Sequence, residues 1–358
     1  MYKKLSHIST ELNDLRNNGV QRGKSVGWDW SLFPYTVKEG STTYIGAAPA
    51  SGKTEFWFEI LLNLSCLHGW KHIIFSPETG EPKDIYSELC HKFVGKPYLG
   101  EGRMDETEKA YAEMFIDEHF IIIDPVDEDL TIDMFYKKVE DIENELGTKF
   151  NTTTIDPWNE LTENYVPADL GREDKYLSRI LGTVRKNARK TNRHNCIVTH
   201  VRDQAMLTQN NIRYFPMAHA RDFAGGQVWY RKGMSVLLPW RPPVGLMDDN
   251  GRPNDHNQMV LNISKTIPNG NSKNGTYNLH YDLQRSRYYV DDFGKRVYAN
   301  RGEYEPKILD KPKEVIQPNL AFDDVTPPPP KVEVKKIELN KDYKPEEDFL
   351  NYKEPWEQ

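Results

Sequence analysis

Short apolar segments alternate with segments of helical periodicity along most of this chain. The apolar segment 42–47 is followed by a segment to residue 67 in which apolar residues recur every three or four positions. This pairing continues to residue 199. The predicted strands are 42–47, 71–76, 120–123, 152–155 and 195–199, and the predicted helices are 55–67, 83–93, 132–146 and 175–191. Such alternation predicts an α/β fold, a mostly parallel sheet with helices on both faces.

The two ends of the chain have different patterns. Further strands are predicted at 235–238, 259–264 and 276–282, the later ones antiparallel. At the N-terminus, Leu5, Ile8, Leu12 and Leu15 share one face of a short predicted helix. A helix this short is marginal alone in water, so we expect it to pack on its own domain or on a neighbouring subunit. We therefore divide the chain into an N-terminal helix and connector (1–22), one α/β domain (23–305) and a disordered Pro-rich, acidic tail (306–358).

Composition is that of a soluble globular protein, with 28% charged and 37% hydrophobic residues. No apolar run has the length of a membrane span, and the N-terminus lacks a signal-peptide apolar region, so we expect a cytoplasmic location. Cys66, Cys90 and Cys196 lie far apart, which excludes a disulfide framework and a cysteine-built zinc site and predicts buried thiols. The formal net charge of −7 argues against a general nucleic-acid coat but is compatible with a local basic surface.

A phosphate-binding loop lies between the first strand and the first helix. Residues 46–54 read Gly-Ala-Ala-Pro-Ala-Ser-Gly-Lys-Thr, the pattern GxxxxGK[ST] with Ala47 in place of its first glycine. Small residues let backbone N–H groups surround a phosphate at a helix N-terminus. We expect Lys53 to reach the β- and γ-phosphates of ATP or another NTP, and Thr54 to offer its hydroxyl to Mg²⁺. The predicted nucleotide-binding residues are Ala47, Ala48, Pro49, Ala50, Ser51, Gly52, Lys53 and Thr54.

Polar residues follow three of the other predicted strands. Glu78 follows the second strand and is our candidate to polarise the attacking water. Asp156 follows strand 152–155 and is expected to hold Mg²⁺, while His200 follows strand 195–199 and could sense the γ-phosphate. Asp124, after strand 120–123, competes for the metal role. We prefer Asp156 because it lies one strand–helix unit before His200.

The order of these motifs resembles the RecA-like motor domain of DnaB-type hexameric replicative helicases. It comprises residues 47–54, then Phe-Ser-Pro-Glu at 75–78, Thr-Ile-Asp at 154–156 and Val-Thr-His at 198–200. The chain is similar to the phage primase–helicase and mitochondrial Twinkle branch over roughly residues 23–289. The resemblance accounts for Ala47, because DnaB proteins also carry alanine there. It implies a RecA-like P-loop NTPase, with catalytic roles at Glu78 and His200 and a metal-organising role at Asp156.

The resemblance also implies a DNA-binding loop facing the central channel of a ring. The stretch 222–227, which contains Gly225 and Gly226, resembles the end of that loop, so the long irregular segment 201–221 would form the rest. Its cations are spaced by polar residues, which suits contacts to successive phosphates of a single strand. The predicted DNA-binding residues are Arg202, Arg213, Arg221, Gly225 and Gly226.

Two departures from the family pattern matter. The family places a Lys and, two residues later, an Arg on a late strand to reach the γ-phosphate of the neighbouring subunit. Lys265 fits the first place, but Ile267 occupies the second. Lys273, Arg285 or Arg287 would then substitute, or activation across subunits is weak. The second departure is that no primase domain, zinc ribbon or DnaB-type N-terminal helical domain is recognisable.

We therefore expect an ATP-driven, ring-forming DNA helicase or translocase, a homo-oligomer and most simply a hexamer, acting on single-stranded DNA in replication. A phage-encoded protein would work in the bacterial host cytoplasm. A separate primase or replisome protein is an expected partner, and the aromatic residues 349–356 are a candidate docking motif. The alternatives are a RecA-type recombinase and a nucleotide-switch helicase loader or regulator.

Overall fold

The computed structural model of the protein describes residues 2–124, 129–202, 204–248 and 251–305. The chain divides into two units, Met1–Lys307 and Ile308–Gln358. The predicted tail 306–358 and its aromatic end lie outside the described residues, so the fold below is that of the first unit alone.

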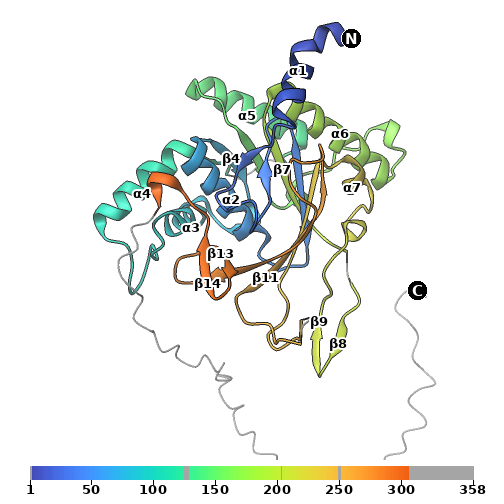
Figure 1. The fold of residues 1–358 in the computed structure, drawn as a ribbon. Helices are drawn as coiled ribbons and strands as arrows, with labels where there is room; N and C mark the ends of the chain where they lie inside the picture. Colours follow the sequence, from blue (N-terminus) through green and yellow to red (C-terminus); the bar gives the residue numbers. More distant parts are fainter. Residues whose placement is uncertain (1, 125–128, 203, 249–250, 306–358) are drawn as a thin grey trace, which may run out of the picture. The chain divides into compact units, whose positions relative to one another are not determined.

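A ten-stranded sheet dominates the described part of the chain, in the order β14-β13-β12-β11-β10-β3-β7-β6-β4-β5 (Figure 1). Strands β10, β3, β7, β6, β4 and β5 are parallel, whereas β11 to β14 continue the sheet with antiparallel pairs. The predicted mostly parallel sheet with antiparallel C-terminal strands is thus confirmed. The strands are β3 (Thr42–Ala47), β4 (His72–Phe75), β5 (Phe120–Ile122), β6 (Thr152–Ile155), β7 (His194–His200), β10 (Ser235–Trp240), β11 (Gln258–Thr266), β12 (Gly275–Asp282), β13 (Arg287–Asp292) and β14 (Lys295–Tyr298).

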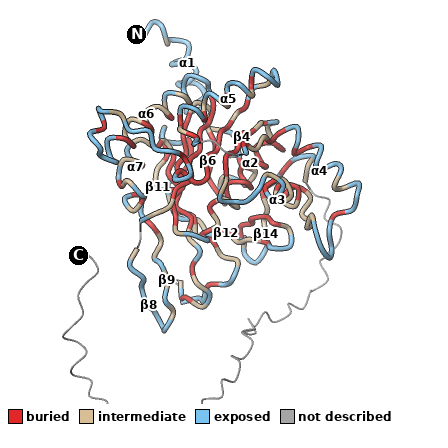
Figure 2. The backbone as a smooth tube through the Cα atoms, turned by 180° about the vertical axis from the view of Figure 1, so that it is seen from behind, coloured by how far each residue is buried: buried red, intermediate tan, exposed pale blue. Residues whose placement is uncertain are grey.

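Helices cover both faces of this sheet and create two cores. One core contains apolar residues of α2 (Lys53–His68), α3 (Pro82–Val94) and α4 (Glu106–His119). The other contains residues of α5 (Ile132–Leu146), α6 (Glu173–Thr191) and α7 (Val228–Lys232). Successive residues of β3, Tyr44 and Ile45, belong to different cores because strand side chains alternate between faces. Figure 2 shows the buried residues concentrated along the sheet between the two helical layers.

Several elements escaped the hydrophobic pattern. Helix α4 buries only Ala112, Phe115, Ile116 and His119, too narrow a stripe to stand out, and it begins at a capping box formed by Asp105 and Glu108. Strands β1 (Lys24–Ser25) and β2 (Thr36–Val37) have two residues each. The segment 201–221, predicted to be irregular throughout, contains a hairpin of β8 (Leu207–Gln209) and β9 (Ile212–Tyr214). Strands β1, β8 and β9 are largely exposed and carry no apolar signature, whereas the buried β2 is too short to show an alternating pattern.

The N-terminal helix α1 (Ser9–Asn18) forms as predicted but buries none of its residues. Leu5, Leu12 and Leu15 are all exposed. The expectation that this helix packs on its own domain is therefore wrong for the described chain, because no apolar surface of the domain covers its leucines. Packing on a neighbouring subunit stays a prediction.

Two expectations from composition can be compared with the structure. Cys66, Cys90 and Cys196 are free, buried thiols, as predicted. Among the described helices, none combines the length and the apolar character that crossing a membrane requires.

A buried network of charges ties α2 to the C-terminal segment and to α3. The fully buried Arg301 guanidinium donates to Asn63 Oδ1 at 2.7 Å, to Glu59 Oε1 at 3.1 Å and to the Lys92 carbonyl at 2.5 Å. The Lys92 side chain, also buried, pairs with Glu55 Oε2 at 2.5 Å. Breaking one such buried pair leaves an uncompensated charge and costs about 3–5 kcal/mol. The network therefore fixes the helix that begins at the phosphate loop.

Candidate functional site

The phosphate loop follows β3 directly and ends where α2 begins at Lys53. Its turn uses left-handed backbone at Ala50 (φ 58°) and Gly52 (φ 79°). Lys53 is 7% exposed, and its ammonium group lies 3.3 Å from the Ala48 carbonyl and 3.5 Å from the Ala47 carbonyl. Burial lowers the pKa of Lys53, while the charges of nearby carboxylates act in the opposite direction. A desolvated cation held only by carbonyl oxygens is suited to pair with a phosphate.

Asp156 lies against the same helix end. Its Oδ2 accepts a hydrogen bond from the Thr54 hydroxyl at 2.6 Å, and the residue is only 3% exposed. Burial raises the pKa of Asp156 to about 6, although the Thr54 hydrogen bond and the charge of Lys53 lower it. A hydroxyl and a carboxylate are hard oxygen donors, and Mg²⁺ is usually bound by one or two carboxylates together with substrate phosphates. The residues present therefore fit the metal that the motif implies.

Glu78 and His200 complete the arrangement. His200 pairs with Ala47 across β7 and β3, which sets it beside the phosphate loop. Glu78, in the 3-10 helix Pro77–Thr79 after β4, approaches His200 Nε2 with its Oε2 at 3.1 Å. The buried Nδ1 atom of His200 has no hydrogen-bond partner among the described residues. All the predicted strand-end groups except Asp124 thus gather at the loop.

Asp124 lies elsewhere along the sheet edge. It follows β5, the last strand of the sheet, and β4, β6 and β7 separate that strand from β3. Its side chain is exposed. The structure brings Asp156, and not Asp124, into contact with Thr54.

A second group of residues beside the loop was not expected from the sequence. Tyr288, on β13, donates its hydroxyl to the Gly52 carbonyl at 3.4 Å and packs edge-to-face on Phe56. A Cβ atom on Gly52 would lie 2.8 Å from the Tyr288 hydroxyl. It would also be in van der Waals contact with Met259 at 3.7 Å and with Arg241 at 4.0 Å. These residues come from three antiparallel strands or their ends. Only the register of β10, β11 and β13 could have identified them.

Lys265 lies away from the phosphate loop of its own chain. It pairs with Val236 on β10, which in turn pairs with Tyr44, three residues before the end of β3. Its Nζ donates to the Tyr230 carbonyl at 2.5 Å and lies 4.9 Å from the centre of the Tyr230 ring. Burial lowers the pKa of Lys265. A role at the nucleotide of another subunit remains a prediction.

The cations proposed to replace the missing arginine differ in availability. Arg287 is buried, donates to Glu305 at 2.9 Å and to the Ala299 carbonyl at 2.7 Å, so it cannot reach a neighbouring subunit and that alternative is wrong. Arg285 is bound to Asp282 at 2.8 Å. Lys273 is exposed, although its backbone is fixed by a bond to the Pro34 carbonyl.

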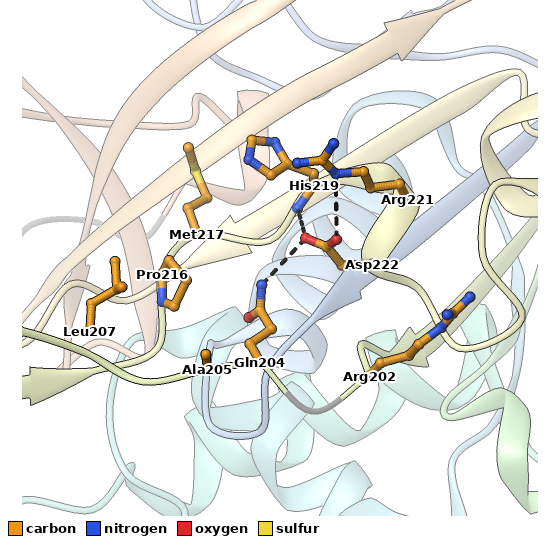
Figure 3. A pocket seen from close by; sticks show the side chains of 9 residues that line it. All are labelled: Arg202, Gln204, Ala205, Leu207, Pro216, Met217, His219, Arg221 and Asp222. Carbon is orange, nitrogen blue, oxygen red and sulfur yellow. Dashed lines mark hydrogen bonds and ion pairs between the residues drawn. The ribbon is translucent and has the colours of Figure 1, made fainter.

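The predicted DNA-binding segment surrounds a cavity of about 440 Å³ at the base of the β8–β9 hairpin (Figure 3). Arg202 and Arg221 line it, whereas Arg213 lies on the exposed face of β9. Asp222 organises the segment by accepting bonds from the His219 backbone at 2.7 Å and from Gln204 at 3.4 Å. The described residues of this segment, 201–202 and 204–221, are therefore more structured than the sequence indicated.

The two predicted DNA-binding glycines have a packing role in this chain. Gly225 (φ 78°) and Gly226 (φ 74°) both have left-handed backbone. A Cβ on Gly225 would meet Leu177 at 1.9 Å, and one on Gly226 would meet the Arg202 guanidinium at 2.7 Å. Glycine suits both positions because a left-handed backbone is strained for other residues, and at Gly225 a side chain would also collide with the buried Leu177.

The end of the DNA-binding segment touches the end of β3 and β7. The Ala224 backbone N–H donates to the His200 carbonyl at 3.2 Å, and Val201 forms an antiparallel bridge with Phe223. The Phe223 ring fills the space beside Gly46, where a Cβ would lie 2.2 Å from a ring carbon. Candidate nucleotide and DNA segments are therefore in direct contact.

Comparisons with known proteins agree with this arrangement. No protein-family model matches the chain. Over 192 residues, 52% of this chain, the sequence is 27% identical to the Twinkle homolog protein, chloroplastic/mitochondrial, of Arabidopsis thaliana. The matched stretch is 26% of that protein, so the chain spans about a quarter of the relative's length.

Solved structures show the same fold. The ATPase domain of G40P matches with a TM-score of 0.59 and 14% identity, covering 82% of this chain and all of that one. A DnaB-like replicative helicase, studied with its interactions with primase, matches with a TM-score of 0.59 and 17% identity, covering 82% and 68%. The predicted resemblance is confirmed: the chain has the RecA-like motor fold of DnaB-type helicases and is similar in sequence to a Twinkle homolog.

Proposed function

We propose that this protein is an ATP-driven helicase or translocase that acts on single-stranded DNA in replication. The observation that carries the proposal is the gathering of Lys53, Thr54, Asp156, Glu78 and His200 at one edge of a RecA-like sheet. Similarity to a Twinkle homolog supports the replicative role. The adjoining segment of arginines supports an action on nucleic acid.

The proposed roles follow from the contacts. Lys53 gives up its hydrogen bonds to the Ala47 and Ala48 carbonyls and neutralises the β- and γ-phosphates of ATP or another NTP. Thr54 and Asp156 would hold Mg²⁺, which supplies charge neutralisation between phosphates when bound. Glu78 orients and deprotonates the attacking water, and His200 fixes the Glu78 carboxylate. Catalysis then rests on positioning of the γ-phosphoryl group.

DNA binding is assigned to the segment around the β8–β9 hairpin. Arg202, Arg213 and Arg221 supply charge for phosphates without reading base edges, which suits a translocase that must accept any sequence. The direct contacts of Phe223 with Gly46 and of Ala224 with His200 give a route from the nucleotide to the DNA.

The oligomeric part of the proposal concerns a ring, most simply a hexamer, with ATP between subunits. Lys265 would act on the nucleotide of a neighbouring subunit, with Lys273 as the other free candidate. Because a DnaB-like relative was studied with primase, a separate primase or replisome protein is a reasonable partner for this chain through its tail.

The test is an ATPase assay with and without single-stranded DNA, followed by unwinding of forked DNA with each polarity of tail. A helicase hydrolyses faster with DNA and separates the duplex. Strand exchange without unwinding would indicate a RecA-type recombinase. Slow hydrolysis that DNA does not accelerate would indicate a nucleotide-switch loader or regulator.

Asp156→Asn should stabilise the protein in the absence of nucleotide and Mg²⁺. The folded-state pKa of about 6 lies above the ordinary 3.8, so the folded state binds the Asp156 proton more tightly than the unfolded state. The resulting stabilisation is complete below about pH 3.8 and is lost as the pH rises through about 6. The variant should therefore exceed wild type by about 1–3 kcal/mol at pH 8, measured by urea denaturation.

The matched control is Asp124→Asn, whose exposed carboxylate should leave stability and ATPase activity nearly unchanged. Asp156→Asn should also lose Mg²⁺-dependent hydrolysis. An Asp156 variant that is less stable than wild type at pH 8, or a larger activity loss at Asp124, would reassign the metal-organising residue.

Glu78→Gln should bind ATP normally and hydrolyse it about 10²–10⁴-fold more slowly, because an amide can neither deprotonate nor orient water as a carboxylate does. Nucleotide binding and single-turnover hydrolysis are measured in parallel. Glu81→Gln, exposed in the next turn of the chain, is the control. Lys53→Ala should lose nearly all ATPase activity, because the side chain that neutralises the phosphate charge is removed. Loss of ATP binding in Glu78→Gln would make that residue structural.

Replacing Arg202, Arg213 and Arg221 by Gln should weaken DNA binding without affecting nucleotide binding. Three phosphate contacts at about 0.7 each would lower the magnitude of the log-affinity against log-salt slope by up to ~2. Affinity is measured by anisotropy over a salt series. A control triple on remote exposed surface, at Arg16, Arg103 and Arg189, should leave the slope unchanged. Equal slopes for the two triples would place the DNA path elsewhere.

Lys265→Ala subunits mixed into wild-type rings should depress ATPase activity more than their mole fraction, because each impairs a neighbour's site. A cation supplied across an interface can be worth ~10³-fold or more. Steady-state ATPase is measured against mutant fraction, with native mass spectrometry confirming mixed rings. Lys273→Ala is the parallel series. If activity declines in proportion to the mutant fraction and the pure Lys265→Ala protein stays active, Lys265 has no role at the neighbouring site. The Lys273→Ala series and an Ile267→Arg variant would then be compared.

A further inference from the structure

The turn between β13 and β14 carries an aromatic residue where the backbone disfavours one. Phe293 and Gly294 form a two-residue hairpin connection in which both φ angles are positive, 51° and 84°. Such turns favour Asn-Gly or Gly-Gly, because a left-handed backbone is strained for a bulky side chain. Strain of this kind persists where a function requires the residue.

The Phe293 side chain also gains nothing from burial. Its exposure is 104% of the reference value, the highest of the large apolar side chains in the described residues. An asparagine would satisfy the turn and remove apolar surface from water. Neither local conformation nor packing within this chain therefore accounts for the phenylalanine.

The arm that presents the ring is rigid. Tyr289 pairs with Tyr298 and Val290 with Val297 in the hairpin ladder, and the Asp291 carboxylate accepts the Gly294 backbone N–H at 2.8 Å. The hairpin is fixed to the N-terminal segment by a bond from Trp28 Nε1 to the Val297 carbonyl at 3.2 Å. The backbone that carries the ring is thus already in place, so binding has to order only the Phe293 side chain.

The neighbours of the ring indicate the kind of partner. Asp291, Lys295 and Arg296 are exposed charged residues, so Phe293 is a single ring among charges and not the centre of an apolar patch. Protein-binding hot spots cluster and are surrounded by residues that exclude water. A lone exposed aromatic ring can instead serve as a stacking platform for an unpaired base, and it accepts every base because each has a π-face.

We propose that Phe293 stacks on an unpaired nucleobase of the DNA on which this protein acts. The inference rests on the proposed function and deepens it by adding a base contact separate from the arginine segment. The contact is to the base and involves no phosphate, because Asp291 and Asp292 balance the charges of Lys295 and Arg296 on either side of the turn. Phe293 thus contributes affinity that does not depend on salt.

The experiment titrates the full chain with single-stranded DNA containing 2-aminopurine, whose fluorescence reports stacking, at several salt concentrations. Phe293→Ala should bind roughly fivefold to a hundredfold more weakly and lose the fluorescence change. Phe293→Tyr and Phe293→Trp should retain both. The salt slope should stay at the wild-type value, because stacking releases no counterions. Leu283→Ala, at an exposed apolar residue in the turn at the other end of β13, is the control and should bind as wild type.

Phe293→Asn separates folding from binding. Its melting temperature should equal or exceed that of wild type because the turn is relieved of strain, while its DNA affinity should match that of Phe293→Ala. Wild-type affinity and fluorescence in Phe293→Ala would overturn the inference. So would a Phe293→Ala variant that no longer forms oligomers in native mass spectrometry but keeps its DNA affinity per subunit, because the Phe293 side chain would then be a protein contact. If wild type itself neither binds single-stranded DNA nor is stimulated by it, the proposed function fails as well.

Discussion

Arg301 and Glu59 face each other in the interior without contact with solvent, and the position of α2 depends on that pair. Burying two charges is favourable only when they have partners, and here Asn63 and the Lys92 carbonyl accept two further hydrogen bonds from the guanidinium. The ion pair between Lys92 and Glu55 holds the same helix one turn nearer the phosphate loop. Because Glu55 directly follows Thr54, the charges that hold the helix also fix the hydroxyl that Asp156 contacts.

The candidate nucleotide site combines a cation and a carboxylate whose pKa values burial shifts in opposite directions. Burial lowers the pKa of Lys53 and raises that of Asp156, so both side chains lie where their charged forms are disfavoured. A phosphate for one and a divalent cation for the other would relieve this. The site is therefore built for ionic ligands, and its own residues are only partly satisfied without them.

Much of the fold and part of the site could be predicted from the sequence because parallel strands bring their carboxyl ends to one edge. The strand ends at Glu78, Asp156 and His200 thus met beside the loop, whereas Asp124 did not, since the spatial order of strands differs from their chain order. Tyr288 and Arg241 could not be found because their approach to Gly52 depends on antiparallel register. Arg287 looked available as a cation, but its burial beside Glu305 is a tertiary property that no local pattern carries.

The contact between the Phe223 ring and Gly46 has a mechanical consequence. Packed interiors have almost no free volume, so a ring pressed against backbone cannot yield when either side shifts. The Phe223 ring thus contacts both the strand that leads into the phosphate loop and the end of the segment that carries the arginines. A displacement of a few tenths of an ångström on one side of this contact would have to be accommodated on the other side, without any change of charge.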